Sequence, residues 1–375
     1  MSNIDNILLN IKELNYNNSI PNRTVRDKLI NYVEKFLSKT KRKIYGGTAI
    51  NKFVKIYDDF EEPDYDVYTP QPKKDAIDLA HYLFDLGIKD TAVSRGVTKG
   101  TFKVFAYKLE AVDFSFMPEK MYNLIPFTKI NNLYYTSPEY LRIDLLLAIV
   151  NPQKSIYLWE KTLPRYLKLK NKFKIKEVKY ENKTIFNQNA INLINKIIKN
   201  NIDVVVTGIT AYRILVLKSN IKHIYLPNIS FLEVLTVKPV KLLKKIIEIY
   251  GIDNIIIKHF NQFLKIIPSK FVVYYKNQRL INIYYLEDKC FPFIRLDDML
   301  ISSYDYLELY FNALIYQYKI INNKNLKNFS KCILFNLDKC RNLYLKKKGS
   351  NIIDDKLLQL LNASPRSMGV YCLYM

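Results

Sequence analysis

The spacing of apolar residues along the first half of the chain predicts alternating helices and strands. From Thr24 to Lys39 apolar side chains recur every three or four residues, the period of a helix with one buried face. The same period predicts a helix from Asp75 to Leu86, and Gly87 supplies its C-terminal stop. Two strands are expected next, over Thr101–Tyr107 and Leu109–Phe116, and the first of them alternates apolar and polar residues. This pattern predicts a mixed α and β fold.

A glycine turn interrupts the pattern between the first helix and the second. The apolar pair Ile44 and Tyr45 stops at Gly46 and Gly47, and a helix-like segment follows from Thr48 to Tyr57. Glycines let backbone amides approach a ligand without a Cβ in the way. The N-terminal end of the following helix adds partial positive charge. The stretch is therefore suited to binding phosphate.

Three carboxylates follow this turn in a defined order. Asp64 and Asp66 are two residues apart in a strand-like context, so both side chains are expected on one face of a strand. Asp113 lies in the strand expected over Leu109–Phe116. Carboxylate oxygens are the ligands that Mg²⁺ prefers, and two such ions roughly 4 Å apart serve phosphoryl chemistry. The sequence therefore predicts that these three residues are catalytic and hold metal for nucleotidyl transfer.

The glycine turn completes this candidate site. Gly46, Gly47 and the Thr48 hydroxyl are expected to bind the β- and γ-phosphates of a nucleotide, and Asn51 is a candidate support for the loop. Each part alone has an ordinary interpretation, such as a tight turn, a solvated strand edge or a surface amide. The order of turn, paired carboxylates, helix and lone carboxylate makes the combined interpretation much more specific.

The second half of the chain repeats the first in weakened form. Val206–Tyr212 resembles Ile44–Ile50, and Phe231–Thr236 resembles Asp64–Thr69. The residues expected at the three acidic positions of this copy are Phe231, Glu233 and Asn282. We therefore expect an α+β protein of two tandem domains with the same fold, the second of them degenerate and with helical additions.

The expected domains are a flexible arm over residues 1–22, a catalytic domain over 23–185 and a degenerate domain over 186–375. Within the last of these, the apolar spacing predicts the helix Val240–Tyr250 and the strands Lys270–Tyr275 and Leu280–Leu286. Two further helices are expected over Asp297–Asn322 and Lys327–Leu345. Within the expected catalytic domain, Ser137 and Pro138 predict the start of another helix.

The formal charge of +23 over 375 residues indicates a polyanionic partner, with nucleic acid favoured over a membrane surface. Lys, Asn, Ile and Tyr are all abundant, so mutational bias toward A and T is a second source of the lysine excess. From Glu160 to Lys183 nine Lys and Arg residues stand against three Glu. Lys161 and Arg165 in this strip are candidates to bind the triphosphate or RNA, or they are surface residues.

Other sequence features indicate the cellular compartment of the protein. No run of about 18 uncharged apolar residues is present, which argues against a membrane-spanning helix. The N-terminal residues lack a basic and then apolar signal pattern, so secretion is not expected. Four cysteines without a Cys-x-x-Cys pair favour a reducing compartment.

These motifs together resemble a known family. The turn and the carboxylates resemble the signature of the DNA polymerase β-like nucleotidyltransferase superfamily. This resemblance implies that the two tandem domains are nucleotidyltransferase-like, of the polymerase β palm type. Further stretches are similar to the poly(A) polymerase catalytic subunit of large nucleocytoplasmic DNA viruses, which include poxviruses and giant amoebal viruses. The stretches that carry this resemblance are Glu139–Leu145, Pro152, Ser155–Lys161 and Pro164–Leu167.

The resemblance implies a template-independent enzyme that adds AMP from ATP to RNA 3′ ends with Mg²⁺ or Mn²⁺ as cofactor. It maps the family's three carboxylates onto Asp64, Asp66 and Asp113. It also implies polyadenylation of viral mRNA in the host cytoplasm, at the viral factory, with packaging in the virion as a further expectation. The chain resembles the shorter giant-virus enzymes, some of which self-associate, so the resemblance implies a homodimer or a viral processivity factor as partner.

Two alternatives stay open at this point. One is another RNA terminal nucleotidyltransferase, of the uridylyl or CCA-adding type, because the residues that recognise the base form no portable motif. The other is a basic RNA-binding protein that kept the fold and lost activity. Retention of all three carboxylates in the first copy argues against the second alternative.

Overall fold

The computed structural model describes residues 23–56, 64–150, 159–180, 186–199, 201–263, 266–287 and 293–348. The arm expected over residues 1–22 lies outside this range, as does Tyr57 at the end of the helix expected from Thr48. The chain forms two compact units, Met1–Leu141 and Arg142–Met375. Within the described residues, each unit is built on one seven-stranded sheet.

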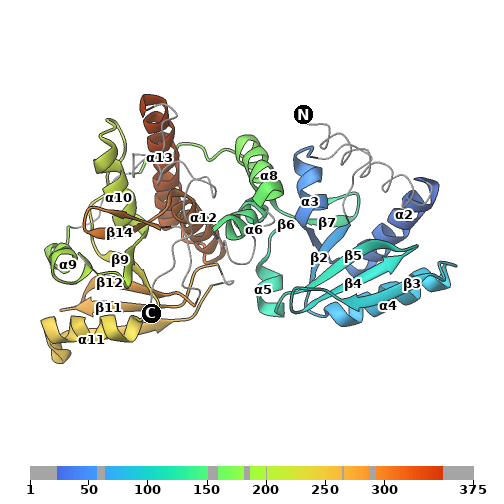
Figure 1. The fold of residues 1–375 in the computed structure, drawn as a ribbon, viewed down its shortest axis with the longest axis horizontal. Helices are drawn as coiled ribbons and strands as arrows, with labels where there is room; N and C mark the ends of the chain where they lie inside the picture. The colour runs from blue at the N-terminus through green and yellow to red at the C-terminus, as the bar shows by residue number, and fades with distance from the viewer. Residues whose placement is uncertain are drawn as a thin grey trace, which may run out of the picture. The chain divides into compact units, whose positions relative to one another are not determined.

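The first unit alternates helices and strands as the apolar spacing predicts. Its elements in chain order are α2 (Arg23–Thr40), β1 (Lys43–Tyr45), α3 (Gly46–Phe53), β2 (Tyr65–Thr69), α4 (Pro72–Asp85), β3 (Thr91–Arg95), β4 (Thr101–Ala106), β5 (Leu109–Phe116), α5 (Glu119–Leu124), β6 (Phe127–Ile130) and β7 (Leu133–Thr136). The strand order is β3-β4-β5-β2-β1-β7-β6. Helices α2 and α4 pack against each other, and both contact β5 near the centre of the sheet (Figure 1).

The sheet places the acidic residues by register. Asp66 on β2 stands opposite Tyr45 of the antiparallel strand β1 and opposite Asp113 of the parallel strand β5. The strand β1 leads directly into the glycine turn and α3. The turn and the carboxylates therefore meet on three adjacent central strands.

The second unit begins with helices and continues with its own sheet. Its elements are α6 (Pro138–Val150), which begins in the first unit, α8 (Trp159–Lys172), α9 (Gln188–Leu193), the π-helix η2 (Ile194–Ile198), β8 (Val204–Val206), α10 (Gly208–Ser219), β9 (Leu232–Thr236), α11 (Pro239–Tyr250), the 3₁₀ turn η3 (Ile252–Asn254), β10 (Ile255–Phe260), β11 (Lys270–Tyr275), β12 (Gln278–Tyr285), β13 (Phe293–Leu296), β14 (Met299–Ser302), α12 (Tyr304–Ile320) and α13 (Lys324–Lys348).

The second sheet repeats the first strand for strand. Its order is β10-β11-β12-β9-β8-β14-β13, which is the order of the first sheet with each strand replaced by its later counterpart. Glu233 stands opposite Asn282, as Asp66 stands opposite Asp113. The expected duplication and the expected α+β class are therefore confirmed in the described residues.

One predicted helix is wrong over its first residues. The sequence predicts a helix over Asp297–Asn322, but Met299–Ser302 is strand β14 and the helix α12 begins at Tyr304. The apolar run from Met299 to Ile301 fits either structure by itself. Parallel pairing with β8 decides in favour of a strand, and the Ser303 side chain, which accepts a hydrogen bond from the Tyr306 amide, caps the helix instead.

The segment between the two repeats packs with the second unit. Lys170 on α8 lies 2.8 Å from Glu308 on α12 and 2.8 Å from Asp338 on α13. The domain boundary predicted between residues 185 and 186 stays a prediction, whereas the compact units divide after Leu141.

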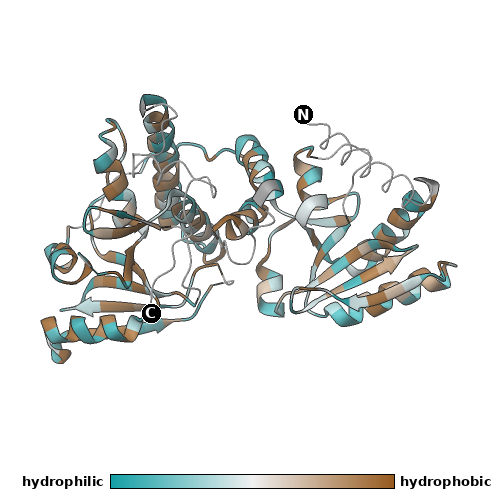
Figure 2. Cartoon of the chain, in the orientation of Figure 1, coloured by the Kyte–Doolittle hydropathy of each residue, from teal (hydrophilic) through white to brown (hydrophobic). Residues whose placement is uncertain are grey.

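Burial follows the amphipathic pattern of the helices. Helix α11 alternates hydrophobic and hydrophilic residues along its turns, and its buried residues are Leu242, Leu243 and Ile246 (Figure 2). Among the described residues, Cys332 and Cys340 are buried free thiols. No described helix has the length and apolar character needed to cross a membrane.

Candidate active site

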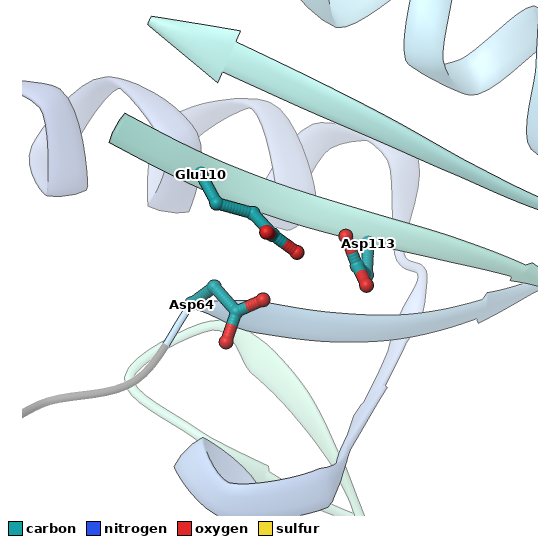
Figure 3. A group of neighbouring side chains, drawn as sticks. All are labelled: Asp64, Glu110 and Asp113. Atoms are coloured by element: carbon teal, nitrogen blue, oxygen red, sulfur yellow. The ribbon is translucent and has the colours of Figure 1, made fainter. Parts of the chain in front are cut away.

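Three carboxylates converge on the first sheet. Asp64 lies immediately before β2, and Glu110 and Asp113 lie on the neighbouring strand β5 (Figure 3). One carboxylate oxygen from each lies within 4.8 Å of the other two. The structure therefore brings Asp64 and Asp113 together as predicted from the sequence, and it adds Glu110.

The close approach of like charges changes how these groups titrate. Burial, and then Glu110, raises the pKa of Asp64 to about 6. Burial and Glu110 likewise raise the pKa of Asp113 to about 7, against the opposing effect of Lys103. Burial alone would raise the pKa of Glu110, but hydrogen bonds with Asp113 and Lys103 lower it. A cation placed among these oxygens would relieve their mutual repulsion.

Glu110 was missed because a regular strand would point it to the opposite face. Residues three apart alternate faces, so Glu110 and Asp113 should diverge. The β4–β5 register shifts between Val104, which faces Val112, and Phe105, which faces Glu110. The extra residue of this bulge, Ala111, returns Glu110 to the face of Asp113. The consecutive apolar pair at 111 and 112 is the sequence signal of this break in alternation.

Asp66 lies beside the cluster and against the glycine turn. Gly46 has φ +67°, and a Cβ there would overlap the Asp66 carboxylate. The second repeat has the same geometry: Gly208 has φ +60°, and Glu233 Oε2 accepts a hydrogen bond of 2.7 Å from the Ile209 amide. An acidic side chain therefore lies against the turn glycine in both repeats. Metal binding by Asp66 stays a prediction.

The other predicted phosphate-loop residues have defined structural contacts. The buried Thr48 hydroxyl donates to the Asp64 carbonyl oxygen at 2.9 Å, which links the turn to the first carboxylate. Gly47 is buried in the first turn of α3. The Asn51 side chain accepts a hydrogen bond of 2.9 Å from the Ile56 amide and so closes the C-terminal end of α3. Their contacts with phosphate stay predictions.

Lys161 and Arg165 lie on α8 in the second unit. Lys161 is exposed, and partial burial lowers the pKa of Arg165. Their predicted contact with nucleotide or RNA stays a prediction.

The chemistry of the cluster fits a divalent cation. Its donors are hard carboxylate oxygens, as Mg²⁺ and Mn²⁺ prefer. Among the described residues, Asp113 Oδ1 is one of the buried side-chain oxygens that have no hydrogen-bond partner. Such an oxygen is costly to bury unless a ligand satisfies it. Asp64, Glu110 and Asp113 can therefore surround a metal ion.

The second repeat lacks this chemistry at every matching position. Phe231 stands in the place of Asp64, and Asn282 in the place of Asp113. Arg279 takes the place of Glu110, because it faces Tyr274 across the same bulge. The second site is therefore built without the clustered carboxylates.

The sheet order, the glycine turn and the acidic cluster define a nucleotidyltransferase fold. Comparison of the structure with solved structures agrees with this class. The crystal structure of the Megavirus polyadenylate synthase matches with a TM-score of 0.81 and 21% identity, covering 96% of this chain and 78% of that one.

Comparison of the sequence points to one family of this class. Residues 31–155 match the family described as the poly(A) polymerase catalytic subunit. A predicted poly(A) polymerase catalytic subunit of African swine fever virus is 32% identical over 167 residues, which is 40% of this chain and 35% of that protein. Its counterpart from Acanthamoeba polyphaga mimivirus is 27% identical over 157 residues, 40% of this chain and 27% of that protein.

The resemblance drawn from the motifs is thereby confirmed over residues 31–155. The chain spans about a third of the length of these curated relatives. All the site residues of the first repeat, from Gly46 to Asp113, lie inside the matched region.

Proposed function

We propose that this protein is a template-independent poly(A) polymerase, which transfers AMP from ATP to the 3′ end of RNA. The observation that carries the proposal is the carboxylate cluster of the first repeat, which includes the buried Asp113 oxygen without a partner. The match to the poly(A) polymerase family over residues 31–155 supports the choice of reaction. The net charge of +23 supports RNA as the acceptor.

Each residue of the site has a separate role in the proposed reaction. Asp64 and Asp113, with Asp66 beside them, would hold Mg²⁺ or Mn²⁺, which when bound neutralises phosphate charge and makes the attacking hydroxyl more acidic. Gly46 and Gly47 form the N-terminal end of α3, which would bind the nucleotide phosphates. Thr48 fixes the main chain of Asp64 through its hydrogen bond. Orientation and charge neutralisation are the main requirements of nucleotidyl transfer.

The setting of the reaction is part of the same proposal. The relatives come from African swine fever virus and mimivirus, which supports viral mRNA as the acceptor. Action in the cytoplasm of an infected cell and packaging in the virion stay predictions. Self-association, or a viral processivity factor, would keep the enzyme on its RNA.

Primer extension tests the proposal. The chain is incubated with a labelled RNA primer, Mg²⁺ or Mn²⁺ and each nucleoside triphosphate in turn. ATP should be incorporated, and Asp113→Asn, which copies the residue of the second repeat, should abolish extension. The matched control is Asp85→Asn, which removes an exposed carboxylate from the end of α4.

Each outcome has a distinct meaning. No extension by the unsubstituted chain, or full extension by Asp113→Asn and by the double variant Asp64→Ala/Asp66→Ala, would refute the catalytic assignment. A preference for UTP would keep the mechanism and identify a uridylyltransferase instead.

A further inference from the structure

A lysine lies among the carboxylates of the first repeat. Lys103 on β4 stands opposite Asp113 of β5, and its Nζ lies 3.0 Å from Asp113 Oδ2. The same ammonium forms an ion pair with Glu110. Lys103 therefore contacts two of the three carboxylates of the cluster. A divalent metal ion in this cluster would bind the same carboxylate groups that Lys103 neutralises.

The second repeat also has a cation at its corresponding site, but it comes from a different position. Val272 stands opposite Asn282, where Lys103 stands opposite Asp113. The cation there is Arg279, whose Nε donates a hydrogen bond of 2.8 Å to Asn282 Oδ1. Its guanidinium carbon lies 4.0 Å from the centroid of the Phe231 ring. The three carboxylates of the first repeat are thus replaced by the cation Arg279, its hydrogen-bond acceptor Asn282 and its stacking partner Phe231.

These two arrangements differ in how easily the cation can leave. Arg279 is stacked on an aromatic ring and bonded to an amide, so its departure would leave a buried amide without a partner. Lys103 sits on a flexible four-carbon stem, a quarter of its side chain is exposed, and it has Glu110 as a second partner. Withdrawal of Lys103 from Asp113 therefore leaves the ammonium paired.

We propose that Lys103 is an exchangeable cation of this site. It balances Asp113 in the metal-free protein, and Glu110 retains the ammonium when a divalent ion takes its place at Asp113. Lys103 and Glu110 are then positioning residues that set the affinity and the order of metal loading. The inference rests on the proposed function, because it takes Asp113 as a metal ligand.

A double-mutant cycle on metal affinity tests this exchange without measuring catalysis. Mn²⁺ binding to the full chain, stripped of metal, is measured by titration calorimetry and by the electron paramagnetic resonance signal of free Mn²⁺. The variants are Lys103→Met, Glu110→Gln and their combination. Lys108→Met is the matched control, since it removes an exposed lysine from the turn that joins β4 and β5.

The exchange predicts two results. Lys103→Met removes the competing cation and should tighten the Kd for Mn²⁺ by about two- to fivefold, the range of a partly exposed ion pair. Glu110→Gln leaves Lys103 with Asp113 alone and should weaken binding. That loss should be about two- to fivefold larger with Lys103 present than in the Lys103→Met background.

The opposite pattern would overturn the inference. If Glu110 binds the metal itself, removing Lys103 frees it, and Glu110→Gln then costs more in the Lys103→Met background. Equal losses in both backgrounds, or weaker binding by Lys103→Met, would also refute the exchange. Should Lys103→Met fail to fold, Lys103→Gln replaces it. Absence of Mn²⁺ binding by the unsubstituted chain, together with absence of primer extension, would overturn the proposed function itself.

Discussion

The glycine turn allows a direct test of whether only the first repeat is catalytic, because the second repeat contains a turn of the same geometry. Gly46 and Gly208 have φ of +67° and +60°, and a Cβ at either would overlap the carboxylate beside it, Asp66 or Glu233. Alanine in a left-handed conformation costs about 1–2 kcal/mol relative to its preferred regions. With melting temperature changing by roughly 2–4 °C per kcal/mol, each substitution should lower it by about 2–8 °C, with the displaced carboxylate adding to the loss.

The two substitutions should differ in activity. In Gly46→Ala the Asp66 carboxylate must rotate away from the turn, because its backbone is paired on both sides with Tyr45 and Asp113. A displacement of about 1 Å in such a site costs about 100-fold in rate. Gly208→Ala displaces Glu233 in a repeat without the clustered carboxylates and should leave primer extension within about threefold of the unsubstituted rate.

Thermal denaturation and primer extension, measured on both variants, separate an effect of the turn on stability from an effect on activity. Comparable losses of activity in both would show that the turn acts only through stability. An unchanged melting temperature for Gly46→Ala would refute the steric argument from which the magnitude is taken.

Three further predictions follow from other parts of the chain. Because burial and Glu110 raise the pKa of Asp64 to about 6 and of Asp113 to about 7, the folded metal-free protein binds more protons than the unfolded chain between about pH 4 and 7. Its melting temperature should therefore fall as pH rises through this range, and Asp113→Asn should flatten the slope; an unchanged slope would contradict the assignment. Glu308 is fully buried beside Lys170, so Glu308→Leu should cost about 3–5 kcal/mol in unfolding free energy. Adding Lys170→Met should recover part of this loss in chemical denaturation, and no recovery would argue against the ion pair as its source. Replacing Lys161, Arg165 and Lys168 together by Gln should reduce the slope of log affinity for single-stranded RNA against log salt by about 2. A slope unaffected by the triple variant would show that this part of α8 makes no phosphate contact.

The local sequence pattern was sufficient to predict a helix or strand where one face of the element is buried and its ends carry clear capping or turn signals. The strands β5 and β11 were predicted at their observed bounds, and helix α2 to within one residue at each end. The duplication was also visible, since the positions of Asp66 and Asp113 could be aligned with Glu233 and Asn282 before their register was known. These features depend on the period of the apolar residues and on turn chemistry, both of which are properties of neighbouring residues.

Other features depended on contacts between strands that are distant in sequence. Strand β14 exists because Leu300 and Ile301 pair with Val205 and Val206, about 95 residues earlier, which no local propensity reports. Both repeats use a β-bulge to bring Glu110, or Arg279, onto the face of the site, and a bulge changes the face of every residue beyond it.

The sequence alone therefore determined the order of turn and carboxylates, and with it the class of chemistry. The tertiary structure decided which carboxylates actually meet. It placed Glu110 and Lys103 beside Asp113, and it placed the Asp66 carboxylate against Gly46. The physical reason is that strand period and turn type are set within a few residues, whereas register, bulges and the sharing of charge are set by the neighbouring strand.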